Sequence, residues 1–175
     1  GVDTPRGLTS MFTGLYPKHH GCSIRSRWAR DFMYDVFTIF DLFQKHNYPM
    51  LFQINKYFYE FGELPNKEYK NLKLTFTLED ALRDIKTNAD KKDLFAFIDL
   101  EDYHWAMDDY AHTSMGEHHG QRHLSNAFDM IFNVIDKDDF DYIFIFSDHG
   151  CKLADELKKG DNIEFLTDDR TKIIM

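Results

Sequence analysis

Cysteine, positive charge and long hydrophobic runs are all scarce in this sequence. Its two cysteines, Cys22 and Cys151, exclude a disulfide framework and a Cys-x-x-Cys metal pair, and they leave the cellular compartment open. With 21 Lys and Arg against 30 Asp and Glu, the formal charge is −9 and no basic run offsets it. Binding to nucleic acid is therefore not expected. No apolar stretch approaches the roughly 18 residues that a membrane-spanning helix needs, and no signal-peptide pattern is present.

What the sequence does contain is enough apolar material for one globular domain. The 175 residues are 43% hydrophobic and include 17 Phe and 9 Tyr, which is far too aromatic for a disordered chain. A chain of this length can bury roughly two thirds of its unfolded surface in a single core. The chain begins at Gly1 with a dense motif and ends at Met175 within a strand-like run. We therefore expect a fragment of a longer protein rather than a complete domain that has been trimmed.

Hydrophobic periodicity predicts an α/β fold. Apolar residues recur at helical spacing in four segments, and short apolar runs between them are typical of buried strands. The predicted helices span residues 4–13, 38–46, 78–86 and 123–136, and the predicted strands span 50–54, 93–100 and 141–146. Helices and strands that alternate in this way favour parallel crossovers, with helices on both faces of a mostly parallel sheet.

Two of the predicted strands run directly into polar residues. The sequence Glu101-Asp102-Tyr103-His104 follows one strand, and Ser147-Asp148-His149-Gly150 follows another. Ligands of such sheets collect beyond the carboxyl ends of the strands, and a carboxylate beside an imidazole suits a divalent metal. An ordinary polar turn is the alternative for either segment alone. Two such strand ends together favour a metal site.

The opening segment combines a hydroxyl with a helix start. Thr4 precedes Pro5, which is well tolerated in the first turn of a helix. There the helix dipole and the unpaired backbone amides favour an alkoxide and bind a tetrahedral oxyanion. Thr4 is therefore a candidate nucleophile, and a simple helix cap is the alternative.

The opening segment and the Ser-Asp-His-Gly segment together resemble the sulfatases of the alkaline phosphatase superfamily. Thr4 is followed by Thr13-Gly14, Tyr16-Pro17 and His20-Gly21 at matching spacing, and residues 147–150 match a metal-binding element of the same superfamily. The resemblance implies an alkaline phosphatase-like α/β fold. It also implies that residues 1–175 are a fragment of one catalytic domain, lacking an upstream metal-binding strand and the C-terminal part.

The resemblance also implies roles for individual residues. Thr4 would be the nucleophile and a metal ligand, Asp148 and His149 would be metal ligands, and His104 would contact the substrate or a second metal. Asp102 is a lesser candidate for the same contact as His104. The metal would be Ca²⁺, Zn²⁺, Mn²⁺ or Mg²⁺.

Two basic residues of the opening segment are candidates for binding the anionic group of the substrate. They are Arg6 and Lys18. Arg6 departs from the sulfatase pattern, because it lies two residues after the nucleophile position, whereas the family places its Arg four residues after. Leu8 stands there instead.

The implied function is a metal-dependent hydrolase of sulfate or phosphate esters, with a small molecule or a glycan as substrate. Formylglycine is not expected, because Thr4 cannot be oxidised to that aldehyde. Members that keep an unmodified Thr resemble phosphodiesterases and phosphoryl-group transferases of surface polysaccharide or lipid metabolism, which is one alternative. A binding module that has lost its metal is the other. Because the family's upstream Asp motif has no counterpart, we expect this chain alone to bind metal weakly and to show little esterase activity.

Histidines and aromatic residues form two further groups. His119 and His123 have a spacing that can share a metal on a helix, but a histidine-rich solvated loop over residues 108–123 is the favoured interpretation. The aromatic residues of segment 57–61 could stack on a sugar, although a core or partner-facing patch is more common.

Overall fold

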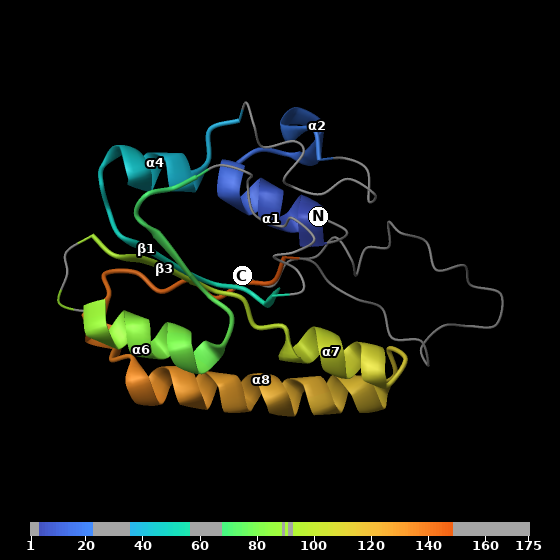
Figure 1. Cartoon of the computed structure of the whole chain (residues 1–175). Coiled ribbons are helices and arrows are strands. Elements are labelled where there is room, and N and C mark those ends of the chain that lie inside the picture. Colours follow the sequence, from blue (N-terminus) through green and yellow to red (C-terminus); the bar gives the residue numbers. More distant parts are fainter. Residues whose placement is uncertain (1–3, 23–35, 57–67, 89, 91–92, 149–175) are drawn as a thin grey trace.

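The computed structural model describes residues 4–22, 36–56, 68–88, 90 and 93–148. Its centre is a parallel three-stranded sheet in the order β2-β1-β3, shown in Figure 1. The strands are β1 (Met50–Gln53), β2 (Leu72–Thr75) and β3 (Phe95–Ile98). Met50 lies opposite both Leu72 and Phe95, so the three strands end together at what we call the carboxyl edge.

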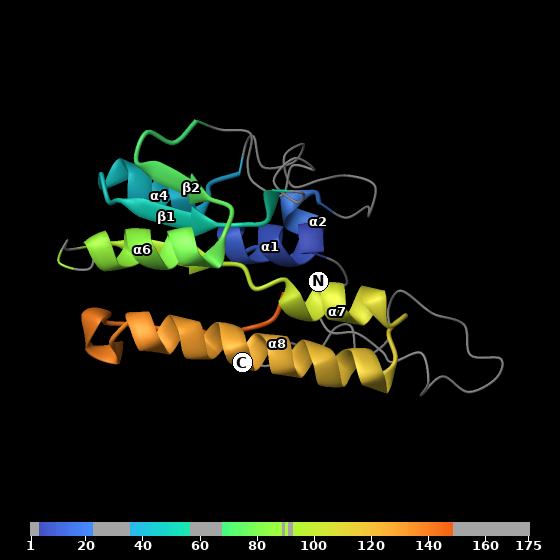
Figure 2. The same cartoon turned by 60° about the horizontal axis from the view of Figure 1, so that its bottom comes forward.

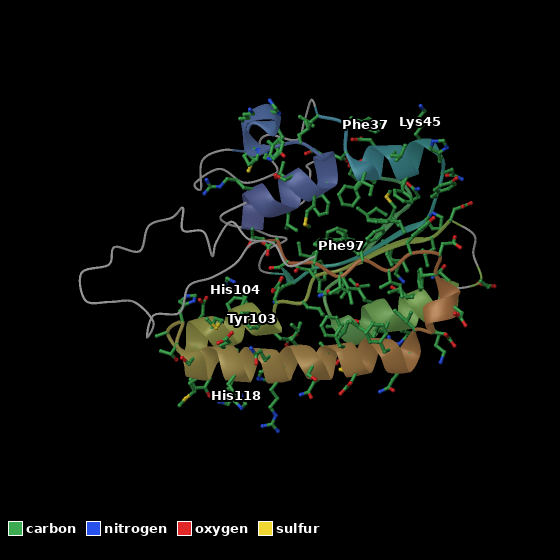
Figure 3. The ribbon with its side chains drawn as sticks, turned by 180° about the vertical axis from the view of Figure 1, so that it is seen from behind. Phe37, Lys45, Phe97, Tyr103, His104 and His118 are labelled. Atoms are coloured by element: carbon green, nitrogen blue, oxygen red, sulfur yellow. The ribbon has the colours of Figure 1, made fainter. Side chains whose placement is uncertain are left out.

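One face of the sheet is covered by α1 (Thr4–Thr13) and α4 (Ile39–Lys45), with the short α2 (Pro17–His20) beyond them. Alternation along β1 sends Met50 and Phe52 to this face, because successive strand side chains point to opposite sides. The buried core here consists of Leu8, Phe12, Phe40, Met50, Phe52 and Ile54. The ring of Phe97, labelled in Figure 3, stacks on Phe52 with centroids 4.5 Å apart.

The other face is covered by α6 (Leu78–Asn88) and α8 (Ser114–Val134), and α7 (Asp102–Asp109) follows β3. The helices α6 and α7 lie end to end, and α8 runs alongside both (Figure 2). The core of this layer consists of Leu51, Leu82, Ile85 and Ile135. Gly120 lets α8 approach α7 closely, since a Cβ there would lie 2.7 Å from Cδ2 of Tyr103.

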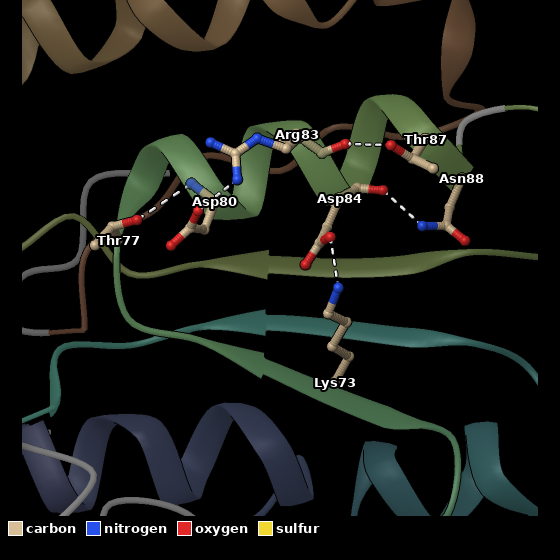
Figure 4. A network of polar contacts seen from close by, with 7 residues as sticks. All are labelled: Lys73, Thr77, Asp80, Arg83, Asp84, Thr87 and Asn88. Carbon is tan, nitrogen blue, oxygen red and sulfur yellow. Dashed lines mark hydrogen bonds and ion pairs between the residues drawn. The ribbon is translucent and has the colours of Figure 1, made fainter.

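Polar contacts link α6 to the sheet (Figure 4). The Lys73 ammonium on β2 pairs with Asp84 of α6 at 2.6 Å. At the start of the helix, the Thr77 hydroxyl accepts a hydrogen bond from the Asp80 amide at 3.2 Å. Exposed pairs of this kind contribute little stability, so the packing of Leu82 and Ile85 against the sheet holds α6 in place. The first turn of α6 borders the carboxyl edge.

Most of the predicted elements are confirmed, and the coarse α/β class with them. Helices at 4–13, 38–46 and 78–86 and strands at 50–54 and 93–100 are present with small changes of boundary. The strand β2 was not predicted. The prediction of a loop over residues 108–123 was wrong, because residues 108 and 109 end α7 and α8 begins at Ser114, well before the predicted start of the helix 123–136. The alkaline phosphatase-like fold remains a prediction.

The predicted strand 141–146 is a second correction. This run forms no strand in the structure and is exposed, with 79% of Tyr142 and 77% of Phe144 accessible to solvent. The physical reason is that strand pairing needs a neighbour: within the described residues β3 pairs with β1 and with no other strand. The run is extended and returns towards the carboxyl edge (Figure 1).

None of the helices in the described part of the chain combines the length and the apolar character that crossing a membrane requires.

Candidate active site

The opening segment and the Ser-Asp-His-Gly segment meet at the carboxyl edge. Gly7, in the first half of α1, lies directly against Asp148: a Cβ on Gly7 would lie 2.7 Å from the Asp148 carbonyl oxygen and 2.9 Å from its Cβ. Real Cβ atoms do not approach so closely, so only glycine allows this contact. Two motifs that are far apart in the sequence are thereby brought together.

Thr4 lies on the same side of α1 as this contact. It is the first residue of the helix, three positions before Gly7, and residues three apart share a helix face. Its side chain is partly exposed. The predicted nucleophile is therefore on the helix face that meets Asp148; its role as nucleophile stays a prediction.

A second carboxylate approaches Asp148. Asp99 directly follows β3, and its backbone amide donates hydrogen bonds to the carbonyl and the side-chain oxygen of Gln53 at 3.2 and 2.9 Å. Burial, and then the charge of Asp148, raise the pKa of Asp99 to about 7. One carboxylate oxygen of Asp148 is itself buried. Two like charges at one strand edge are costly unless a proton or a cation accompanies them.

The other predicted residues lie on three helices, α1, α2 and α7. Lys18 is exposed on α2, and Arg6 is partly exposed on α1. His104 lies on the face of α7 turned away from α8 (Figure 3), where its Nε2 contacts Asp108 at 3.3 Å. Asp102 begins α7 and is exposed. The prediction for His149 falls outside the described residues.

The donor set around Asp148 is compatible with a divalent cation. Carboxylate and hydroxyl oxygens suit hard cations, and one carboxylate oxygen of Asp148 is buried at this edge. Within the described residues, no group of three or more His, Cys, Asp and Glu side chains is arranged to hold a metal. The predicted set of Thr4, Asp148 and His149 extends beyond those residues.

Histidines of α8 and its neighbours serve other contacts. Tyr110 stacks on His119 with ring centroids 4.6 Å apart, and His118 points outward from α8 in Figure 3. Asp108 contacts His112 as well as His104. The four-residue spacing of His119 and His123 therefore has no described third ligand that would make it a metal site.

A pair of carboxyl groups that the sequence pattern did not indicate lies beside the site. Glu101 lies within hydrogen-bonding reach of Asp99. Its two oxygens accept hydrogen bonds from the Asn55 amide and the Trp105 indole, each at 3.2 Å. Burial, and then the charge of Asp99, raise the pKa of Glu101 to about 8. The sequence feature that could have indicated this pair is Asp99, the first carboxylate after the apolar run of β3.

His20 of the opening segment has a structural part in this arrangement. It is 2% exposed, its Nδ1 accepts a hydrogen bond from the Cys22 amide at 3.1 Å, and its Nε2 lies 3.0 Å from the Ser10 hydroxyl. Burial lowers the pKa of His20 below 6.5. A neutral ring that carries its proton on Nε2 therefore ties α2 to α1, which in turn holds Thr4 and Gly7.

Comparisons with protein-family models, curated proteins and solved structures gave no match to this chain. The resemblance to sulfatases therefore rests on the residues of the motifs themselves.

Proposed function

We propose that this protein is a metal-dependent hydrolase of phosphate or sulfate esters with Thr4 as its nucleophile. The observation that supports this proposal most strongly is the contact between Gly7 and Asp148. This contact joins the helix that begins at Thr4 to the Asp of the Ser-Asp-His-Gly segment. The two motifs that carry the resemblance are therefore neighbours in the fold.

The chain's own residues supply the parts that an in-line displacement needs. The oxygen of Thr4 would attack the phosphorus or sulfur atom, forming a new ester to Thr4 while the bond to the leaving oxygen breaks. The N-terminus of α1 would stabilise the negative charge of the transferred group, and Arg6 or Lys18 would add positive charge. His104 would protonate the leaving oxygen. Water or an acceptor alcohol would then discharge the Thr4 ester.

A divalent cation would be held by Thr4, Asp148 and His149. When bound, it would supply Lewis acidity and lower the pKa of the Thr4 hydroxyl. Asp99 lies close enough for its pKa to respond to the Asp148 charge, so its carboxylate would add to the negative field that attracts the cation.

Phosphate is the better candidate for the transferred group. Sulfatases of the resembled family expel sulfate from a hydrated aldehyde, a route that an ordinary Thr ester cannot follow. A phosphoryl group carries more negative charge on its equatorial oxygens, so positive groups stabilise its transfer more effectively. We therefore propose phosphate diesters or phosphonate esters as the preferred substrates.

The test compares p-nitrophenyl esters in the natural protein that carries this sequence, with Mn²⁺, Zn²⁺, Ca²⁺ or Mg²⁺ added. We expect a phosphate diester or phosphonate ester to turn over faster than the sulfate ester, and we expect chelation of the metal and Thr4→Ala each to abolish turnover. The control is Thr87→Ala, which removes an exposed hydroxyl of α6 that donates to the Arg83 carbonyl at 2.7 Å. Faster sulfate turnover would overturn the choice of phosphate, and turnover by the Thr4→Ala variant would overturn the nucleophile.

A further inference from the structure

A cavity opens beyond the carboxyl ends of all three strands, on the side of the sheet that α6 and α8 cover. Its volume is about 300 Å³. The lining comes from the residues that follow each strand, from the starts of α6 and α7, and from one face of α8. Because a water molecule occupies about 30 Å³, the cavity has room for a small organic molecule.

Among the described residues that line this cavity, carboxyl groups outnumber basic groups, and the only basic side chain is the imidazole of His123. Four carboxyl groups line it, those of Glu79, Asp99, Glu101 and Asp102, and none of the described residues that line it is Lys or Arg. Two of the four have a structural explanation: Glu79 and Asp102 lie in the first turns of α6 and α7, where a carboxylate offsets the positive end of the helix dipole.

Asp99 and Glu101 do not have that explanation. Asp99 lies outside the helices, and Glu101 makes no side-chain capping hydrogen bond although it directly precedes α7. Asp99 and Glu101 lie side by side and partly buried, within hydrogen-bonding reach of each other. A ligand that brought positive charge would remove the repulsion between them.

Other side chains that line the cavity indicate which kind of cation it would bind. The Trp105 indole borders the cavity beside Glu101 and is 38% exposed, and indoles are the best side chains for binding ammonium groups. The amide of Asn126, on the face of α8 that lines the cavity, offers hydrogen bonds to a polar chain. Described carboxyl groups do not converge as the ligands of a bare metal ion would, and the cavity is larger than such an ion needs.

We propose that this cavity binds a small organic cation, an ammonium group on a short hydroxylated chain, between Trp105 and the carboxyl groups of Asp99 and Glu101. The proposal does not depend on ester hydrolysis, because it concerns binding to a cavity beside the proposed catalytic residues. It can therefore succeed or fail independently of the role of Thr4.

Calorimetry on the full chain, in the presence of chelator, tests the proposal with choline as probe and 3,3-dimethyl-1-butanol as its neutral isostere. We expect saturable binding of choline and at least tenfold weaker binding of the isostere. A Trp28→Phe variant leaves Trp105 as the sole tryptophan, and choline is expected to change its fluorescence over the same concentration range. Equal binding of the two probes, or no saturable choline binding, would overturn the proposal.

Three variants locate the site, each checked for folding by circular dichroism. Glu101→Gln keeps the shape and removes the charge, and Trp105→Leu removes the indole. Each is expected to weaken choline binding about tenfold. Asp129→Asn removes an exposed carboxylate of α8 that does not line the cavity, and it should bind choline as the unmodified chain does. An equal loss in Glu101→Gln and Asp129→Asn would show nonspecific attraction to an acidic protein. Displacement of choline by Ca²⁺ or Mn²⁺ alone, with the chelator omitted, would assign the site to an inorganic cation. Either result would overturn the proposal.

Discussion

Gly7 is the residue on which the contact between α1 and Asp148 depends. Glycine is normally a poor choice inside a helix, because it costs about 1 kcal/mol relative to alanine. Here the Asp148 backbone occupies the space that a side chain would need. The unfavourable helix residue is therefore the one that lets two motifs meet.

The first prediction concerns Gly7→Ala. In an uncrowded helix this change would stabilise the protein by about 1 kcal/mol. Against Asp148 we expect the opposite sign, a loss of about 1–3 kcal/mol in the free energy of unfolding, because overpacking forces the backbone apart. Urea denaturation measures the change. Gly7→Ser should cost at least as much, and a stabilised Gly7→Ala variant would show that α1 does not lie against Asp148.

His20 gives the second prediction, which concerns pH. Burial lowers the pKa of His20 in the folded protein, whereas in the unfolded chain the imidazole takes up a proton as the pH falls through about 6.5. The unfolded state then binds more protons, so stability is lost as the pH falls below about 6.5.

The measurement compares the unmodified protein with His20→Asn, whose side-chain oxygen can still accept from the Cys22 amide. We expect the free energy of unfolding of the unmodified protein to fall more steeply between about pH 7 and pH 5 than that of the variant, because only the former carries this histidine. Parallel pH profiles would contradict a neutral, buried His20.

At the scale of elements, local periodicity predicted the helices well because each depends on residues close in sequence. The predicted α1 matches the observed helix at both ends, and Gly14, with a φ of 67°, ends it as expected. The strand β2 was missed although Leu72, Lys73 and Leu74 alternate in character. Four residues are too few for alternation to be distinguished from chance, and only pairing with β1 makes them a strand.

The 141–146 run shows the opposite error. Its composition is typical of a buried strand, but a strand exists only where a neighbour supplies hydrogen bonds, and the described residues supply none. The same limit explains why the contact of Glu101 with Asp99 was not foreseen. Spacing alone does not say which side chains turn towards each other once β3 ends.

The third prediction tests the exposure of this run with Phe144→Lys. Because Phe144 is 77% exposed, we expect the free energy of unfolding to change by no more than about 0.5 kcal/mol. Phe52→Ala is the reference for a buried ring, since Phe52 is 1% exposed, and it should cost about 3–5 kcal/mol. If Phe144→Lys is as costly as Phe52→Ala, the run is a buried strand after all, as its composition predicts.

At the scale of the whole molecule, the parallel sheet explains how the candidate site arises. Parallel strands present their carboxyl ends at one edge, so Asp99 and the residues near Asp148 reach that edge from different parts of the chain. The motifs of the sequence led us to expect the opening segment near the Ser-Asp-His-Gly segment, and the contact of Gly7 with Asp148 agrees with this proximity; a site shared by Thr4 and Asp148 stays a prediction. The sequence was not sufficient to predict the cavity, whose walls come from the segments after all three strands and from α6, α7 and α8, which only the folded chain brings together.

The central claim, that Thr4 is the nucleophile, is tested most directly by identifying the residue that becomes esterified during turnover. The natural protein is quenched in acid during hydrolysis of a p-nitrophenyl phosphate diester and mapped by peptide mass spectrometry, because a phosphothreonine ester survives acid. We predict the phosphoryl adduct on Thr4, with none on Thr9 or Thr13 of the same helix, and a strongly reduced adduct in Asp148→Asn. An adduct on another residue, or hydrolysis by the Thr4→Ala variant at the unmodified rate, would contradict it.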